Sequence, residues 1–174
     1  DYEPASLHQT EPSLIKAQTW HHVAATWDGK MKRIFIDGKQ AVGFPFSGVV
    51  RPGHTALRLG AYGSEGVASS FYNGDLAMAT VHDQALEHDS LAALFAVRGL
   101  NMPKGDSVMA CWPFTEERGA QVVDASSNGR DGRIINRGTW MIGGPSFDAA
   151  AIGRHDSAYD PTKDTKRGHG LRLA

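Results

Sequence analysis

The chain has 174 residues, enough for one domain with a buried core, and its 41% hydrophobic and 21% charged residues are typical of a globular protein. A formal net charge of −1 gives no electrostatic case for nucleic acid or an anionic membrane as a partner. No apolar run approaches the roughly 20 residues that span a bilayer, and the first residues lack the pattern of a signal peptide. The single cysteine, Cys111, excludes an internal disulfide framework. We therefore expect a cytoplasmic protein.

Residues 1–19 are polar and contain two prolines, which predicts an irregular lead-in. From residue 20 to 83, short apolar runs alternate with glycine-containing turns: WHHVAATW, RIFI, AVGF, VV, ALRLGA and DLAMATV. This spacing is typical of an antiparallel sandwich or barrel. The first runs turn at Asp28-Gly29 and again at Asp37-Gly38, which are strong hairpin signals, so we expect a β-hairpin followed by the start of another.

The sequence period changes at residues 87–97, EHDSLAALFAV, where Leu91, Leu94 and Phe95 fall on one helical face. Gly99 is suited to end a helix. We expect one short helix here.

Residues 105–143 return to short strands, with VMACWPF, RIIN and TWMI separated by the glycine-containing turn SSNGRDG. Residues 144–174 contain few apolar side chains and include GGP, DPTKDTK and GHG. We expect them to form a loop or an irregular tail that needs a partner or further chain to become ordered.

The stretch WHHVAATWDGKMKRIFIDGKQAV resembles the signature of the laminin G-like (concanavalin A-like) jelly-roll family. ALRLGA, FYNGDLAMATVHDQAL and the helix ending in LAALFA continue the resemblance in order, over roughly residues 20–96. The resemblance implies an all-β fold, an antiparallel jelly-roll β-sandwich with one short helix and an irregular C-terminal tail.

A second block, VMACWPFTEERGAQVVDASSNGRDGRIIN, resembles the opening of the same kind of domain. The order is therefore reversed: residues 20–98 correspond to the C-terminal part of such a sandwich, and 105–143 to the N-terminal part. The chain carries either the back of one domain and the front of another, or a permuted sandwich whose late strands complete the early ones. Unpaired strands aggregate, so some pairing must occur in either case. We favour an internal segment of a longer polypeptide.

The run WPF…VVDASSNGRDGRIINRGTW…GPSF, with RGHGLRLA beyond it, is similar to the large (β) subunit family of N,N-dimethylformamidase. That family carries a laminin G-like region ahead of its catalytic part, and it hydrolyses a small N,N-dialkylated amide at an iron ion held by tyrosine and glutamate. No residue of this chain matches those iron ligands. The resemblance therefore implies a non-catalytic region whose partners are other domains or subunits of a larger protein, with the iron elsewhere in that protein.

Catalytic patterns within the chain itself are missing from the sequence. Retaining glycanases on this fold need two carboxylates about 5–5.5 Å apart, which their strands supply as Glu-x-Asp-x-x-Glu. Glu116 and Glu117 are adjacent and would point to opposite faces of a strand. There is no Gly-x-Ser-x-Gly run, and Cys111 lies in an apolar strand, where we expect an inert buried thiol.

Two places in the sequence contain residue types that can bind metal ions. His21 and His22 are consecutive on a strand, so their rings point to opposite faces, and we expect them to form hydrogen bonds across strands. Hard oxygen atoms that could bind calcium surround the later glycine turn, in Asp124, Ser126, Asn128 and Asp131. The favoured alternative is that Asp124 and Asn128 brace this turn by hydrogen bonds to the backbone. Related modules often have Asp-Glu where this chain has Ala77-Met78, which counts against calcium.

A lectin-like site would combine an exposed aromatic ring with polar groups on a loop. The sequence offers these candidates: Trp20, Tyr62, Phe71, Tyr72 and Asn73. The leading hypothesis is nevertheless a non-catalytic laminin G-like module that packs against other parts of a larger amidohydrolase. The alternative is a free-standing carbohydrate-binding module with a glycan as its partner. A third hypothesis, an enzyme acting alone, lacks a catalytic pattern to support it.

Overall fold

The computed structural model describes residues 9–49, 53, 56–63, 67–99, 101–136, 138–142 and 169–173. Its elements in chain order are η2 (Pro12–Leu14), β1 (Val23–Trp27), β2 (Met31–Ile36), β3 (Lys39–Pro45), β4 (Gly74–Leu76), β5 (Ala79–His82), α1 (His88–Val97), β6 (Val108–Trp112), β7 (Gln121–Val122), β8 (Gly132–Arg133), β9 (Thr139–Ile142) and β10 (His169–Leu173). All strand pairs are antiparallel. The predicted all-β class with one short helix, consistent with a concanavalin A-like β-sandwich, is confirmed.

The first three strands form one sheet in the order β1-β2-β3, as the two Asp-Gly turns predict. Val23 pairs with Ile36 and Trp27 with Lys32, so the register follows from the turn at Asp28-Gly29. At the second turn Asp37 and Gly38 both have positive φ, +51° and +75°. This is the backbone that a two-residue hairpin turn requires and that glycine adopts without strain.

The helix α1 packs against this second turn. A Cβ at Gly38 would lie 3.2 Å from Cα of Ala92 and 3.2 Å from Cβ of Phe95, so a larger residue would push the helix away. Arg98 takes the left-handed conformation after the last turn, and its N–H donates to the carbonyl of Phe95. The predicted helix and its end are confirmed, and no helix among the described residues is long and apolar enough to cross a membrane.

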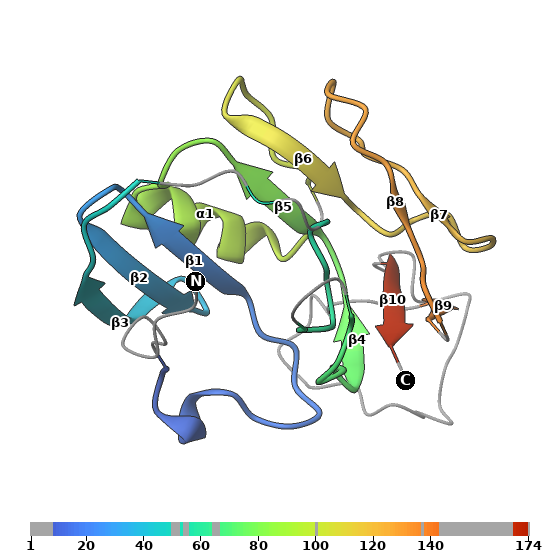
Figure 1. Ribbon diagram of the computed structural model, residues 1–174, viewed down its shortest axis with the longest axis horizontal. Helices are drawn as coiled ribbons and strands as arrows, with labels where there is room; N and C mark the ends of the chain where they lie inside the picture. Colours follow the sequence, from blue (N-terminus) through green and yellow to red (C-terminus); the bar gives the residue numbers. More distant parts are fainter. Residues whose placement is uncertain are drawn as a thin grey trace.

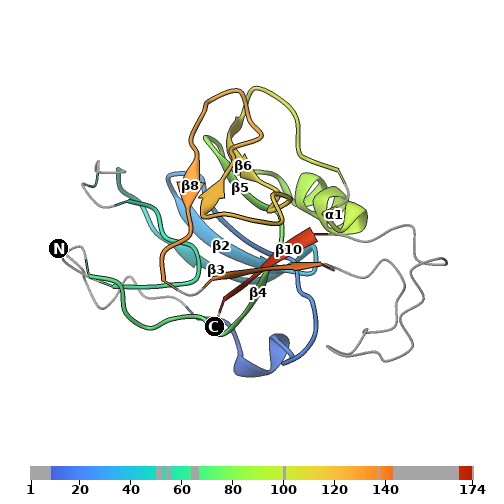
Figure 2. The ribbon, with the colours of Figure 1, turned by 90° about the vertical axis from the view of Figure 1, so that its right-hand side faces the viewer.

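Strands from the two sequence blocks share sheets. β5 from the first block pairs with β6 from the second, with Thr80 opposite Cys111, and β4 pairs with β10, which also pairs with β9. Figure 1 shows β1–β3 and α1 on one side of the molecule and the remaining strands on the other, and Figure 2 gives the view at right angles. Early and late strands therefore pair in two of the sheets, whereas the β1-β2-β3 sheet contains early strands alone.

The core joins the same two blocks. Ala110, Trp112, Phe114 and Val122 are buried together. Leu76, Ala79, Ile134 and Trp140 pack against them and are partly buried. Indole N–H groups hold two of the rings in place, because Trp112 donates to the carbonyl of Arg130 at 2.8 Å and Trp140 to that of Gly119 at 2.8 Å. The block at 105–143 is therefore part of the same core as β4 and β5.

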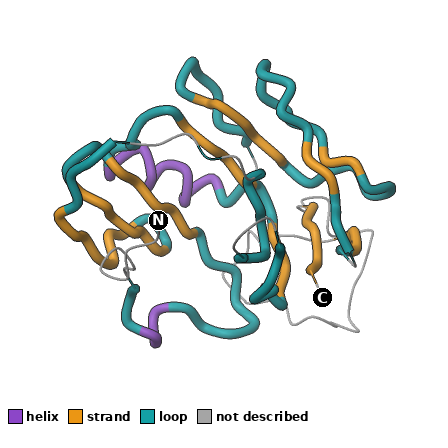
Figure 3. The backbone as a smooth tube through the Cα atoms, viewed as in Figure 1, coloured by secondary structure: helices purple, strands orange, loops and turns teal. Residues whose placement is uncertain are grey.

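Two sequence expectations differ from the structure. The apolar run ALRLGA (56–61) forms no regular strand; one isolated bridge, Tyr62 to Ser69, closes this segment instead. Within the predicted tail, residues 169–173 form β10, which the sequence analysis did not anticipate. The rest of that tail lies outside the described residues. Figure 3 shows how much of the described backbone is loop between short strands.

Candidate functional site

The turn at residues 124–131, here called the Asp124 turn, is built around one buried carboxylate. Asp124 Oδ1 accepts hydrogen bonds from the N–H groups of Cys111 (2.9 Å) and Ser126 (2.9 Å). Its Oδ2 accepts from the N–H of Arg130 (2.8 Å) and the hydroxyl of Ser126 (2.8 Å). Burial disfavours the charged carboxylate, but these four donors outweigh it and hold the pKa of Asp124 well below its usual range.

Asn128 and Asp131 complete this brace. The Asn128 amide donates to the carbonyls of Val108 (3.0 Å) and Met109 (3.1 Å). Asp131 accepts from the N–H of Asp124 at 2.9 Å through Oδ1 and from the Gln121 amide at 2.8 Å through Oδ2. The sequence-based interpretation that Asp124 and Asn128 brace the turn is confirmed.

The four residues predicted for calcium are thus brought together, but by hydrogen bonds within the protein: the carboxylates of Asp124 and Asp131 accept, and the Ser126 hydroxyl and the Asn128 amide donate. Every carboxylate oxygen of Asp124 and Asp131 already accepts an N–H or O–H group. Calcium needs six to eight oxygen ligands, and N–H groups pointing at the same atoms would have to be displaced. Within the part of the chain that the structure describes, no group of three or more His, Cys, Asp or Glu residues could hold a metal ion. The arrangement does not fit calcium, and its binding stays an untested prediction.

Cys111 and His21, which were considered as a nucleophile and as a metal ligand, both contact neighbouring groups of the protein. The Cys111 side chain is 1% exposed and its thiol lies 3.7 Å from Sδ of Met78. Burial, with the Asp124 charge, raises the pKa of Cys111, so the thiol stays protonated and unreactive, as predicted. His21 accepts the N–H of Lys16 at Nε2 (3.0 Å), so the proton of a neutral ring sits on Nδ1, which faces Asp37 Oδ2 at 2.8 Å.

His22 differs from its neighbour. Its Nδ1 is buried and has no hydrogen-bond partner, and its ring centroid lies 6.2 Å from that of Phe95 on α1. Burial lowers the pKa of His22, partly opposed by the charge of Asp37. The ring is therefore held neutral between the first sheet and the helix.

Four of the five residues predicted for ligand binding lie in one segment, the described residues 56–63 and 67–73, here called the apolar segment. Its two arms are joined by the Tyr62–Ser69 bridge and by a 2.9 Å hydrogen bond from the N–H of Tyr72 to the carbonyl of Gly60. Tyr62 is 62% exposed and Phe71 is 59% exposed. Trp20 is separate from this group and half-buried just before β1.

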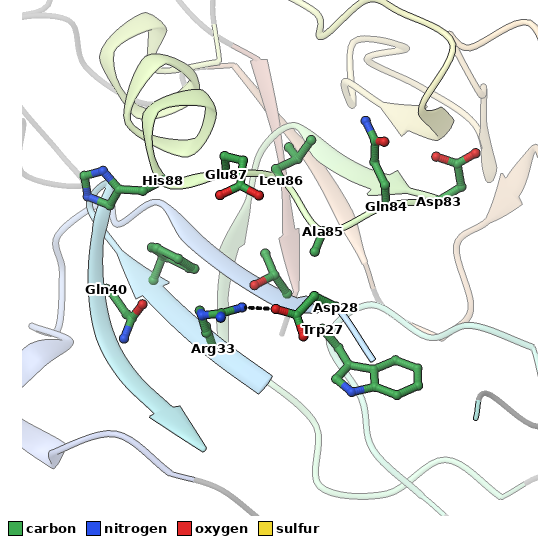
Figure 4. Close-up of a pocket in the computed structure, with 12 residues that line it drawn as sticks. Trp27, Asp28, Arg33, Gln40, Asp83, Gln84, Ala85, Leu86, Glu87 and His88 are labelled. Carbon is green, nitrogen blue, oxygen red and sulfur yellow. Dashed lines mark hydrogen bonds and ion pairs between the residues drawn. The ribbon is translucent and has the colours of Figure 1, made fainter. Parts of the chain in front are cut away.

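The described residues also form an open pocket of about 510 Å³ that the sequence analysis missed. One wall is the β1–β2 hairpin with Asp28 and Arg33, whose side chains form a 2.7 Å ion pair. The other wall is the connection from β5 to α1, residues 83–88. Figure 4 shows Glu87 from this connection on the side opposite Arg33. The sequence carries no signal for this pocket, because its two walls come from segments about 50 residues apart that meet only in the folded chain.

Asp28 is fully engaged within this pocket. Its Oδ2 accepts from Arg33, and its Oδ1 accepts from the N–H groups of Lys30 (2.9 Å) and Met31 (2.8 Å). The hydrogen bond from Arg33, helped by those from Met31 and Lys30, holds the pKa of Asp28 well below its usual range. The Asp28 carboxylate and the Arg33 guanidinium are therefore both ionised, and their charges cancel.

Comparison with known proteins identifies the family. A laminin G model, described as concanavalin A-like lectin/glucanases superfamily, matches residues 3–92, just over half of the chain. The chain belongs to this superfamily. Neither a curated protein nor a solved structure gives a significant match.

The superfamily match and the predicted resemblance agree on the region from β1 to the start of α1. The match begins at residue 3, so it also includes most of the predicted lead-in, residues 1–19. It ends before β6, and the second block is tied to the superfamily region by the β5–β6 pairing instead. Membership supports a structural or binding module of the laminin G and concanavalin A type.

Proposed function

We propose that this chain is a non-catalytic interaction module that packs against another domain or subunit of a larger protein through the apolar segment. The single observation that carries the proposal is the exposure of large apolar side chains in that segment. Six of them are at least 43% exposed: Leu57, Leu59, Tyr62, Val67, Phe71 and Tyr72. Several large apolar side chains exposed on one short segment are a candidate protein contact, whereas single exposed apolar residues need no explanation.

The strand edges support the same function. Among the described strands, β1 pairs only with β2, and Val23 on β1 is 59% exposed. An exposed edge strand with an apolar side chain is a surface that proteins normally cover. A neighbouring domain that covered this edge would bury the Val23 side chain, and each Å² of apolar area buried stabilises the contact by roughly 25 cal/mol.

The proposed parent is an amidohydrolase of the N,N-dimethylformamidase type. Support comes from the similarity of the run WPF…VVDASSNGRDGRIINRGTW to the large subunit of that family. The iron and its tyrosine and glutamate ligands would lie in another part of the parent. We therefore expect no hydrolysis of dimethylformamide by this chain alone, and activity only when the catalytic part is present.

Hydrogen exchange tests the contact directly. In the chain alone, backbone amides of the apolar segment should exchange quickly, because its arms share few hydrogen bonds. In the longer polypeptide the same amides should slow by about tenfold or more, while those of β2 stay unchanged. A matched pair of variants sharpens the test: Phe71→Ser should abolish the slowing and Val49→Ser, at an 81% exposed residue outside the segment, should not. Equal exchange in both contexts would contradict the contact.

The second candidate function is carbohydrate binding, and one observation favours it. Three exposed aromatic rings, Tyr62, Phe71 and Tyr72, lie on one short segment, and aromatic faces can stack on sugar rings. A glycan array should then give signals that Tyr62→Ala and Phe71→Ala remove and that Val49→Ala retains. A blank array would count against this candidate and leave the protein contact in place.

A further inference from the structure

We propose that the fold directs spontaneous deamidation to Asn73, a chemical modification that adds one negative charge to the apolar segment. Asp or Asn precedes glycine at five positions of the chain: Asp28-Gly29, Asp37-Gly38, Asn73-Gly74, Asn128-Gly129 and Asp131-Gly132. In such pairs the side chain is prone to react with the backbone that follows it, because glycine has no Cβ to obstruct the approach. The modification does not depend on the protein contact proposed above.

The reaction is a cyclisation followed by hydrolysis. The backbone nitrogen of Gly74 attacks Cγ of Asn73, and its proton is transferred through water to the amide nitrogen. The bond from Cγ to Nδ2 then breaks, so that ammonia leaves and a cyclic succinimide remains. Water opens this ring at either carbonyl, which gives aspartate or isoaspartate. Asparagine and water are thus converted to a carboxylate and ammonium, and no oxidant or reductant is needed.

At four of the five pairs, hydrogen bonds within the protein hold the side chain. The carboxylates of Asp28, Asp37 and Asp131 each accept two or more, and an ionised carboxylate is in addition a poorer electrophile than an amide. The Asn128 amide donates to two backbone carbonyls of β6, at 3.0 and 3.1 Å. The Asn128 side chain therefore has to break these bonds before it can rotate toward the nitrogen of Gly129.

Asn73 is the exception among the five. Its side chain is exposed, and no hydrogen bond to it is found within the part of the chain that the structure describes. Gly74 begins β4, and its pair with Leu173 is the last pair of β4 with β10, where local opening costs least. The Asn73 amide can therefore approach the Gly74 nitrogen without losing a side-chain hydrogen bond.

The wild-type chain contains its own control, because glycine follows both Asn73 and Asn128. The folded chain and the chain unfolded in urea are incubated at mildly alkaline pH, and peptides from timed samples are analysed by mass spectrometry for aspartate and isoaspartate. In the folded chain we expect Asn73 to deamidate about tenfold faster than Asn128, which is the factor that two hydrogen bonds supply. In urea these bonds are gone, and the two rates should agree within about threefold.

Asn73→Gln is the matched variant, because it keeps the amide but its longer side chain must close a larger ring, which is slow. It should remove the deamidated product from this peptide and leave the Asn128 peptide unchanged. In the folded chain the three Asp-Gly pairs should gain no more isoaspartate than Asn128. Equal rates at Asn73 and Asn128 in the folded chain would overturn the proposal. A tenfold preference for Asn73 that persists in urea would overturn it as well, since the selectivity would then come from neighbours in sequence and not from the fold.

Discussion

The Asp124 turn and the apolar segment are both loops of this molecule. The side chains of the turn bond to the protein itself, whereas the apolar side chains of the segment are exposed to solvent. In the turn, each oxygen of Asp124 accepts two hydrogen bonds and the carboxylate is only 6% exposed. In the apolar segment, Tyr62 and Phe71 present most of their surface to solvent. The polar groups of the first loop are bonded to the protein itself, whereas the apolar groups of the second loop face solvent. Under the function proposed above, stability and interaction therefore lie in different parts of one chain.

The same substitution at a buried and an exposed phenylalanine should show this division most strongly. Phe114 is 2% exposed within the core, so Phe114→Ala should lower the free energy of unfolding by about 3–5 kcal/mol through lost burial and a cavity. Phe71→Ala should change it by less than about 0.5 kcal/mol. Urea unfolding followed by tryptophan fluorescence measures both. Equal losses would mean that the apolar segment is part of the core.

Removing the charge of the Asp124 turn is expected to have the next largest effect. In Asp124→Asn an amide nitrogen replaces one carboxylate oxygen, so buried donors at Ser126 and Arg130 or at Cys111 lose their acceptor. We expect the Tm to fall by on the order of 10 °C. Asp106→Asn, in an exposed loop, is the control and should leave the Tm unchanged. An unaltered Tm in Asp124→Asn would show that the turn does not support the core.

Local signals account for the parts of the fold that the sequence predicted correctly. Asp37-Gly38 specifies a positive-φ turn wherever it occurs between alternating strands, and Leu91 to Phe95 repeat with the helical period. Both features depend on neighbours in sequence alone. The bracing role of Asp124 was also predictable, because a short polar residue beside Ser and Asn in a glycine turn commonly bonds to nearby N–H groups.

Most of the features that the sequence did not predict depend on contacts between segments far apart in the chain. Strand β10, with the sequence HGLRL, pairs with β4 on one side and β9 on the other. Its residue types alone give only a weak strand signal. The pocket needs Arg33 from the first sheet and Glu87 from the segment before α1. Asp28 looked like a turn residue and is one, but its second oxygen also pairs with Arg33. Pairings of this kind cannot be read from periodicity.

The pH dependence of stability offers a smaller effect that separates the first sheet from the Asp124 turn. Burial lowers the pKa of His22 in the folded chain, so the unfolded chain binds the proton more readily and stability falls as the pH drops through about 6.5. The depressed pKa of Asp124 acts lower: its contribution is complete above about pH 4 and is lost as the pH falls further.

His22→Phe removes the first of these effects. Because Nδ1 of His22 has no partner, the ring should be replaced at a cost below about 1 kcal/mol at pH 8. Between pH 7.5 and 5 the slope of stability against pH should fall by about half, since burial also lowers the pKa of His82. Urea midpoints at four pH values measure the slope. Asp124→Asn should leave this window unchanged, and an unchanged slope in His22→Phe would show that His22 does not titrate as proposed.

Added calcium is expected to change the Tm least of all. It tests whether the Asp124 turn can bind a ligand as well as hold the core. If the carboxylate oxygens of Asp124 and Asp131 stay committed to their protein donors, an added cation has to displace those N–H and O–H groups, and the folded state gains little binding energy. The Tm should therefore move by less than about 1 °C between excess EDTA and millimolar calcium, because stabilisation by a ligand grows only with its binding to the folded state. A bound ion at a hundred times its dissociation constant would instead add roughly 2.7 kcal/mol, which a thermal scan detects easily. Such an increase, abolished in Asp131→Asn, would mean that the turn exchanges its N–H donors for a metal ion. The Asp124 turn would then bind a ligand itself, as we propose for the apolar segment, and the contrast between the two loops would no longer hold.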